Sequence, residues 1–123
     1  MMCLLAADTT VRLAAVAFTL TWIHSVERIP WEEDWRIVGD LLVPVESRVR
    51  GSGAGMEPGP GARLEGGTWR WRPEVPPRSE LVLARSEAAE DWWLCVAAQP
   101  CRPLASFLPD LAPDTPVRLR SCR

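Results

Sequence analysis

The chain has 123 residues, of which 47% are hydrophobic and 24% are charged, and its formal net charge is -2. This length and composition are typical of one soluble globular domain covering residues 1–123. All 14 basic residues are arginine, and the weakly negative net charge gives no electrostatic basis for nucleic-acid binding.

The start of the chain does not have the pattern of a secretory signal. Such a signal has basic residues before an apolar region, whereas here Asp8 interrupts the apolar run and the first basic residue is Arg12. Leu13–Ile23 is too short to cross a bilayer, so we expect no membrane span in this chain. Either the protein is not exported by a standard signal, or the sequence lacks an upstream segment.

Alternating apolar and polar residues predict strands through the first half of the chain. Phe18–His24 and Trp31–Val38 both alternate with a period of two. Gly39-Asp40 is a two-residue hairpin turn, and Leu41–Arg50 follows it as the partner strand. Proline lacks the backbone N–H that a ladder needs, so Pro44 indicates a sheet edge or a bulge within that strand.

The second half continues with shorter strands after the glycine- and proline-rich loop Gly51–Ala62. We expect Leu81–Arg85 and Trp92–Ala97 to pair with each other, and Pro103–Leu108 to form one helical turn. The other predicted strands are Thr68–Arg72 and Val117–Cys122. The pattern predicts an all-β fold: a small single-domain antiparallel sandwich or partly open barrel, with at most one short helical turn near the C-terminus.

Four cysteines admit three disulfide connectivities. Cys95 and Cys101 are separated by five residues, which suits a short disulfide loop better than a zinc site. Cys3 and Cys122 lie at the two ends of the chain, and chain ends often meet at a domain surface. We therefore predict Cys95–Cys101 and Cys3–Cys122, which would place the protein in an oxidising compartment such as a bacterial periplasm. The alternative is four reduced thiols in the cytosol.

The hairpin turn also predicts which residues face one another. With Val38 opposite Leu41, an unbroken ladder places Glu33 opposite Glu46 and Trp31 opposite Arg48. A symmetric hairpin before it places Trp22 opposite Glu33, and His24 next to Glu33 on the same face. In this register His24, Glu33, Glu46 and Arg48 share one face with three tryptophans: Trp22, Trp31 and Trp35.

Two facing glutamates repel each other unless something offsets their charges. Arg48 could do so by a forked hydrogen bond, or the two carboxyls could share one proton. A divalent cation held by His24, Glu33 and Glu46 is the third hypothesis, and no other cofactor is expected.

The chain resembles a bacterial family catalogued as domain of unknown function eighteen-fifty. The resemblance runs from Phe18 to the C-terminus, through the blocks WIHSVERIPWEEDW, LLVPVESRVRGSGAGMEP and ELVLARS … PVRLRSC. The family has no established activity, and its members are small β-rich domains. The positions that match the family pattern are His24, Ser25, Glu27, Glu33, Glu46, Gly53 and Gly55.

Members of that family are often encoded beside subunits of tripartite substrate-binding-protein-dependent (TRAP) transporters. The resemblance therefore implies a binding or accessory module that works with a TRAP transporter in the periplasm or cell envelope, with no catalytic residues. Its candidate ligand-binding residues are the matching positions together with Arg48. Two alternatives stand beside it: an enzyme that uses Glu33 and Glu46 with His24 for acid–base chemistry, and a purely structural subunit. Many members carry an apolar N-terminal segment, and this chain departs from them there.

Overall fold

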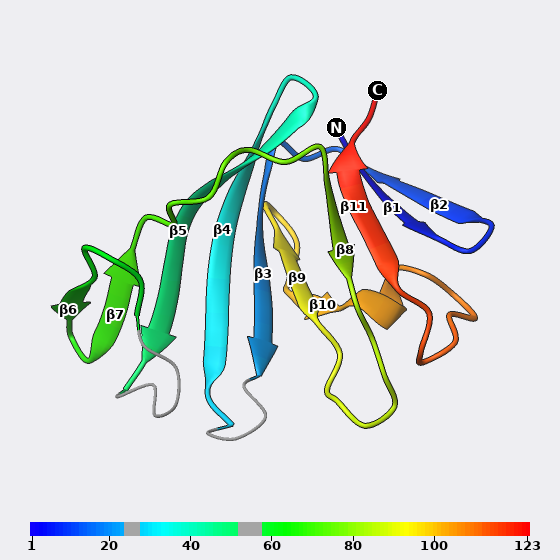
Figure 1. Cartoon of the computed structure of the whole chain (residues 1–123). Coiled ribbons are helices and arrows are strands. Elements are labelled where there is room, and N and C mark those ends of the chain that lie inside the picture. Colours follow the sequence, from blue (N-terminus) through cyan, green and yellow to red (C-terminus); the bar gives the residue numbers. More distant parts are fainter. Residues whose placement is uncertain (24–27, 52–57) are drawn as a thin grey trace.

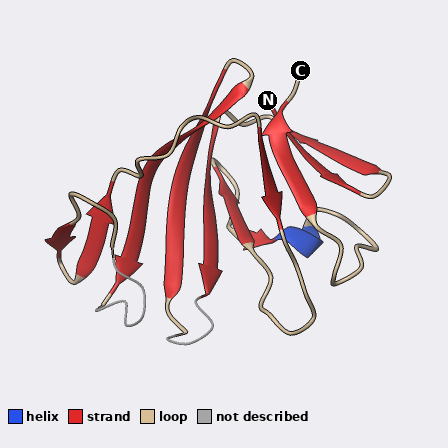
Figure 2. Ribbon diagram, viewed as in Figure 1, coloured by secondary structure: helices blue, strands red, loops and turns tan. Residues whose placement is uncertain are grey.

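The computed structural model describes residues 1–23, 28–51 and 58–123. Over these residues the strands form two antiparallel sheets, which pack as an open sandwich and do not close into a barrel (Figure 2). The single helical element is a 3-10 turn, η1, at Leu104–Ser106 within the described part of the chain. The predicted all-β class and the predicted turn near the C-terminus are both confirmed.

The larger sheet has seven strands in the order β10-β9-β3-β4-β5-β7-β6 (Figure 1). Its central strands are long, because the alternating segments around Gly39-Asp40 pair along most of their length. The bounds are β3 Ala17–Ile23, β4 Pro30–Val38, β5 Leu41–Arg50, β6 Arg63–Glu65, β7 Thr68–Trp71, β9 Trp93–Val96 and β10 Arg102–Pro103.

The smaller sheet has four strands in the order β2-β1-β11-β8. Their bounds are β1 Met2–Ala6, β2 Thr9–Leu13, β8 Glu80–Leu83 and β11 Val117–Ser121. The β1–β2 hairpin was not predicted from the sequence. Met2, Cys3 and Leu4 are all buried, and this unbroken apolar run hides the alternation by which a half-exposed strand is recognised.

The predicted pairing of Leu81–Arg85 with Trp92–Ala97 is wrong. β8 pairs with β11 in the smaller sheet, whereas β9 pairs with β3 in the larger one. The loop between them therefore crosses from one sheet to the other. A salt bridge from Arg85 Nε to Asp91 Oδ1, at 2.9 Å, fixes the two ends of that loop.

Apolar side chains from both sheets fill the space between them. Fully buried residues include Leu4 and Leu119 from the smaller sheet and Leu20 and Leu94 from the larger one. The Phe18 and Trp35 rings stack in this core with their centroids 6.4 Å apart. The face of the larger sheet that carries these side chains is called the inner face below, and the opposite face is called the outer face.

Both predicted disulfides are present. Cys3–Cys122 has a Cα separation of 5.8 Å and Cys95–Cys101 one of 4.1 Å, and the described residues contain no free cysteine. The first bond links residues 119 positions apart. In the chain-entropy model, closing a loop of that length stabilises the fold by about 5 kcal/mol. Within the described ranges, no helix is both long and apolar enough to traverse a bilayer.

Candidate functional site

A bulge in β5 decides which side chains share a face. From Val38–Leu41 to Trp35–Pro44 the β4–β5 ladder follows the register that the turn predicts. The next pair is Asp34–Glu46, so Val45 is an extra residue without a partner on β4. Pro44 precedes it and cannot donate to the ladder, which is the physical reason for a break at this point.

The predicted pairing of Glu33 with Glu46 is therefore wrong. Below the bulge Glu33 pairs with Ser47, and Glu32 pairs with Arg48. Glu33 lies on the inner face and Glu46 on the outer face, because a one-residue shift exchanges the two faces of a strand. The two carboxylates cannot act as one acid–base pair, nor can they hold one cation together.

The β3–β4 hairpin is also shifted, but by two residues. Trp22 pairs with Trp31, and Leu20 pairs with Glu33, whereas the sequence predicted Trp22 opposite Glu33. A shift of two keeps every side chain on its predicted face. Trp22 and Glu33 remain neighbours, and the indole Nε1–H of Trp22 donates to Glu33 Oε2 at 2.8 Å.

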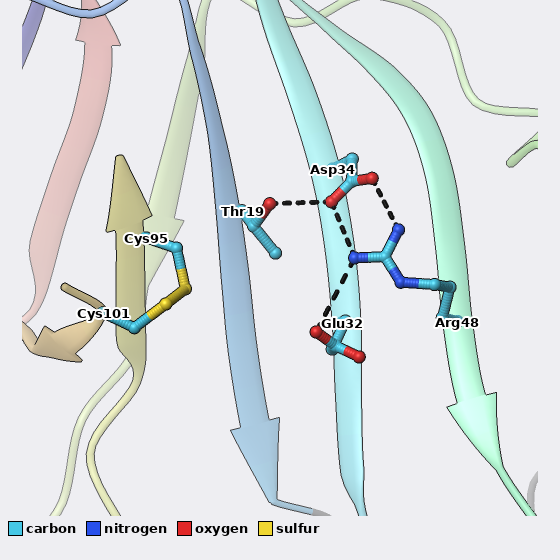
Figure 3. Close-up of a disulfide and its surroundings, with 6 residues drawn as sticks. All are labelled: Thr19, Glu32, Asp34, Arg48, Cys95 and Cys101. Carbon is cyan, nitrogen blue, oxygen red and sulfur yellow. Dashed lines mark hydrogen bonds and ion pairs between the residues drawn. A yellow bond between two sulfur atoms is a disulfide. The ribbon is translucent and has the colours of Figure 1, made fainter. Parts of the chain in front are cut away.

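On the outer face, Arg48 is the centre of an ion-pair network (Figure 3). Its guanidinium donates a forked pair of hydrogen bonds to Asp34, one of them from Nη2 at 2.9 Å. It also donates to Glu46 at 3.0 Å, and its distance to Glu32 is 3.6 Å. Thr19 Oγ1 donates to Asp34 Oδ1 at 2.7 Å. The forked hydrogen bond predicted for Arg48 thus exists, with Asp34 as its partner in place of Glu33.

A second arginine extends the outer network to the edge strands. Arg70 on β7 donates to Glu46 at 2.8 Å, and its Nε lies 3.5 Å from Glu65 on β6. Glu46 therefore accepts hydrogen bonds from two guanidinium groups. These contacts tie four neighbouring strands, β4, β5, β7 and β6, together across the outer face.

The pKa values in the network agree with a set of ion pairs. Burial by itself would raise the pKa of Asp34, but hydrogen bonds from Arg48 and Thr19 outweigh it and lower the pKa. The same balance, with Arg48 and Arg70 as donors, lowers the pKa of Glu46. Hydrogen bonding to Asp34 raises the pKa of Arg48. A proton shared by Glu46 would need a raised pKa, so that hypothesis fails for this residue.

Five of the residues proposed from the sequence lie outside the described part of the chain: His24, Ser25, Glu27, Gly53 and Gly55. Of the described candidates, Glu46 and Arg48 are in contact, and Glu33 lies on the other face. No cluster of three or more His, Cys, Asp or Glu side chains suited to a metal occurs among the residues that the structure describes.

The inner face carries tryptophans around Glu33. The Trp22 and Trp31 rings stack with centroids 5.4 Å apart, and the edge of Trp71 meets Trp31 at 5.6 Å. Trp35 follows Glu33 by two residues on β4 and is 6% exposed. Its indole Nε1–H is fully buried and has no acceptor among the described residues. Buried polar groups are nearly always hydrogen-bonded, so an unpaired indole N–H is unusual.

A cavity of about 240 Å³ lies on the inner face, and we call it the β4–β5 cavity. The connector that leads from β7 to β8 closes it. Figure 1 shows this connector running across β5 and β4, and Arg78 in it exchanges two backbone hydrogen bonds with Leu42. The described lining residues are Glu33, Asp34, Trp35, Pro44, Ser47, Pro73, Val75 and Arg78.

Ser47 is the buried polar residue of this cavity. It is 7% exposed, and it shares the inner face with Glu33 and Trp71, its partners on either side. Its hydroxyl makes no hydrogen bond with any residue in the described ranges. Sequence reasoning missed Ser47 and Arg78, because the first depends on the bulge and the second on how a connector is laid across the sheet. Reading Pro44 as a one-residue bulge would have found Ser47.

A family profile described as "Domain of unknown function (DUF1850)" matches residues 18–104, which is more than half of the chain. The chain belongs to the DUF1850 family. The DUF1850 match contains nearly all of the seven-stranded sheet, the connector and β8, and it leaves out β1, β2 and β11. Both the Arg48 network and the β4–β5 cavity thus lie within the matched region. No curated protein and no solved structure matches the chain.

Proposed function

We propose that this protein is a non-enzymatic binding module, an accessory to a TRAP-type transporter in the cell envelope, whose ligand occupies the β4–β5 cavity. The observation that carries the proposal is one buried polar group beside the cavity, the Trp35 indole N–H, which has no hydrogen-bond partner among the described residues; the Ser47 hydroxyl on the same face makes no hydrogen bond with them either. Leaving a buried group such as this indole N–H unpaired costs about 1–3 kcal/mol, and a bound ligand can supply the missing partner.

The Arg48 network is the weaker candidate for a binding site. Its two central carboxylates, Asp34 and Glu46, already accept hydrogen bonds from Arg48, Arg70 and Thr19. Perturbed pKa values arise in structural ion-pair networks as well as in functional sites. We assign this face a role in holding the sheet together.

Two further observations support the cellular setting. Disulfides form and persist in oxidising compartments, and this chain has two. Membership of the DUF1850 family supports a link to TRAP transporters only through the gene neighbourhood that the sequence resemblance implies. Co-expression with the transporter's membrane subunits tests that link, because an accessory subunit should co-purify with them at a fixed stoichiometry.

Ligand binding is tested by thermal shift with a panel of small organic acids, amines and zwitterions. A ligand of the folded state raises the melting temperature with concentration. Val75→Trp fills the mouth of the cavity at a residue that is 49% exposed, and it should abolish the shift. Val82→Trp is the matched control, since Val82 is 58% exposed on β8 and is not among the residues lining the cavity. A panel without any shift, or one equally affected by both variants, would favour a purely structural subunit.

A further inference from the structure

We infer that the β4–β5 cavity takes a small zwitterion, whose cationic end meets Glu33 and whose carboxylate meets Arg78, Ser47 and the Trp35 indole. This inference rests on the proposed function and names its ligand class. It follows from the charges, the unused hydrogen-bonding atoms and the size of one cavity.

The charges lining the cavity are opposite but are not paired with each other. Glu33 and Arg78 both line it, yet no ion pair joins them, and the Arg78 guanidinium has no partner among the described residues. On the outer face, by contrast, Arg48 and Arg70 both lie in salt bridges with carboxylates. A ligand that carries both charges would bridge the two unpaired groups and leave no charge without a counterpart.

Glu33 is placed to receive a cation. Oε2 accepts the Trp22 indole N–H, and Oε1 has no partner among the described residues. Trp31 and Trp35 flank Glu33 on the same face of β4. Aromatic rings beside a carboxylate are the usual surroundings of a bound ammonium group, because the ring face attracts positive charge.

The donors suit the other end of the ligand. The Trp35 indole can only donate, and the Arg78 guanidinium can only donate, whereas the Ser47 hydroxyl can do either. Three donors beside one cavity call for an acceptor with several lone pairs, which a carboxylate has. The arginine adds the charge that makes such hydrogen bonds stronger than neutral ones.

The size of the cavity limits the ligand. A volume of about 240 Å³ lies just below the range of roughly 300–1,000 Å³ that is typical of sites for drug-sized ligands, so a smaller molecule is expected here. Pro44, Pro73 and Val75 supply apolar wall between the charged residues. A small zwitterion with a short apolar middle suits this space, and L-proline and glycine betaine are two such molecules.

Isothermal titration calorimetry with L-proline and glycine betaine tests the inference on the full chain with its disulfides intact. Two ligands of the same shape as glycine betaine isolate its charges: 3,3-dimethylbutanoate lacks the cation, and choline lacks the carboxylate. We expect at least one zwitterion to bind, and to bind at least tenfold more tightly than either of its single-charge analogues.

Matched variants assign the two ends. Glu33→Gln should weaken zwitterion binding at least tenfold, and Arg78→Gln should do the same. Glu32→Gln is the control for the first, since Glu32 is its neighbour on the opposite face of β4. Arg63→Gln on β6 is the control for the second. Circular dichroism of each variant verifies that the fold is retained.

The outcomes separate this inference from the function on which it rests. If neither zwitterion binds but another class of ligand binds and is blocked by Val75→Trp, the zwitterion inference is overturned and the binding function stands. If 3,3-dimethylbutanoate binds as tightly as glycine betaine, the cationic group contributes nothing to affinity. The proposed contact with Glu33 is then wrong, and the inference also fails. If nothing in the panel binds, both proposals fail together.

Discussion

The two faces of the seven-stranded sheet use polar residues in opposite ways. On the outer face, Arg48 donates hydrogen bonds to Asp34 and Glu46, and its guanidinium lies 3.6 Å from Glu32. On the inner face, the Ser47 hydroxyl and the Trp35 indole N–H have no partner among the described residues. The outer face has the residues most readily associated with catalysis, but Asp34 and Glu46 already accept hydrogen bonds from Arg48, Arg70 and Thr19.

The difference teaches where to look for a site in such a sheet. A charged cluster that satisfies its own hydrogen bonds contributes to stability, whereas unpaired buried groups lower stability and are retained only if something else offsets the cost. Along residues 32–35 of β4, side chains alternate between the ion-pair network of the outer face and the cavity side of the sheet. Neighbours in sequence therefore belong to different environments. The following predictions compare the faces, from the largest expected effect to the smallest.

Arg48→Met should be the most destabilising of these substitutions. It leaves Asp34, Glu46 and Glu32 close together without the guanidinium between them, while methionine preserves much of the apolar stem. Because Arg48 is 15% exposed, we expect a loss of about 2–3 kcal/mol, less than for a fully buried pair. Urea unfolding at pH 7 measures it. A loss below about 0.5 kcal/mol would show that the outer network is no more than a set of surface ion pairs.

Acid should weaken the fold through the outer face. The folded-state pKa values of Asp34 and Glu46 are lowered below their unfolded values, so the unfolded chain binds protons first as the pH falls. The stabilisation is complete above about pH 5 and is lost as the pH falls through the lowered folded values. Thermal melts between pH 7 and pH 2.5 should show this decline, and Asp34→Asn should reduce it. A melting temperature that rises on acidification would contradict the assignment.

Glu46→Gln should cost about 0.5–1 kcal/mol at pH 7, since one charged acceptor is lost while Arg48 keeps Asp34. The related variant Glu33→Gln removes a charge from the inner face, where no cation is paired with it among the described residues. It should therefore change stability by less than Glu46→Gln does. Chemical denaturation of the two variants side by side makes the comparison, and the reverse ranking would refute it.

The smallest change in stability is expected when the hydroxyls of Ser47 and Thr19, on opposite faces of the sheet, are removed and compared. Ser47→Ala removes a hydroxyl that makes no hydrogen bond with any described residue, so stability should change very little. Thr19→Val removes a donor that Asp34 uses, and it should cost about 0.5 kcal/mol. Equal losses in both variants, measured by thermal melts without ligand, would mean that Ser47 has a partner after all.

Much of the fold follows from local patterns that can be read directly. Gly39-Asp40 predicts the β4–β5 turn, and the alternation of Trp31–Val38 identifies the face that Trp31 and Trp35 share. The two disulfides follow from cysteine spacing and from the tendency of chain ends to meet. Partner choice does not follow in this way, because alternation shows that a segment is a strand without showing its neighbour. For that reason the sequence pattern alone pairs the segments of β8 and β9, which lie in different sheets.

The candidate site depends on a single residue of register. A register counted from the turn without the bulge at Val45 pairs Glu46 with Glu33. The bulge shifts the register by one residue, so Glu46 pairs with Asp34. Pro44 indicates a break in the ladder, because a proline within a paired strand cannot donate a hydrogen bond. The proline does not show how many residues are inserted there. The cavity could not be predicted at all. The connector from β7 to β8 closes this cavity. The connector is rich in proline, and no pattern in the sequence shows which strands it crosses.

The Cys3–Cys122 bond also determines how the domain responds to a pulling force. When tension is applied at residues 1 and 123, the covalent bridge carries it, and the 118 residues between the two cysteines feel almost none. After reduction, the load passes to β1 and β11, which lie side by side and antiparallel with Met2 opposite Ser121. Such a pair opens one hydrogen bond at a time, like a zipper, and yields at low force. Reduction of one bond would therefore turn a mechanically inextensible domain into one that unravels from its ends.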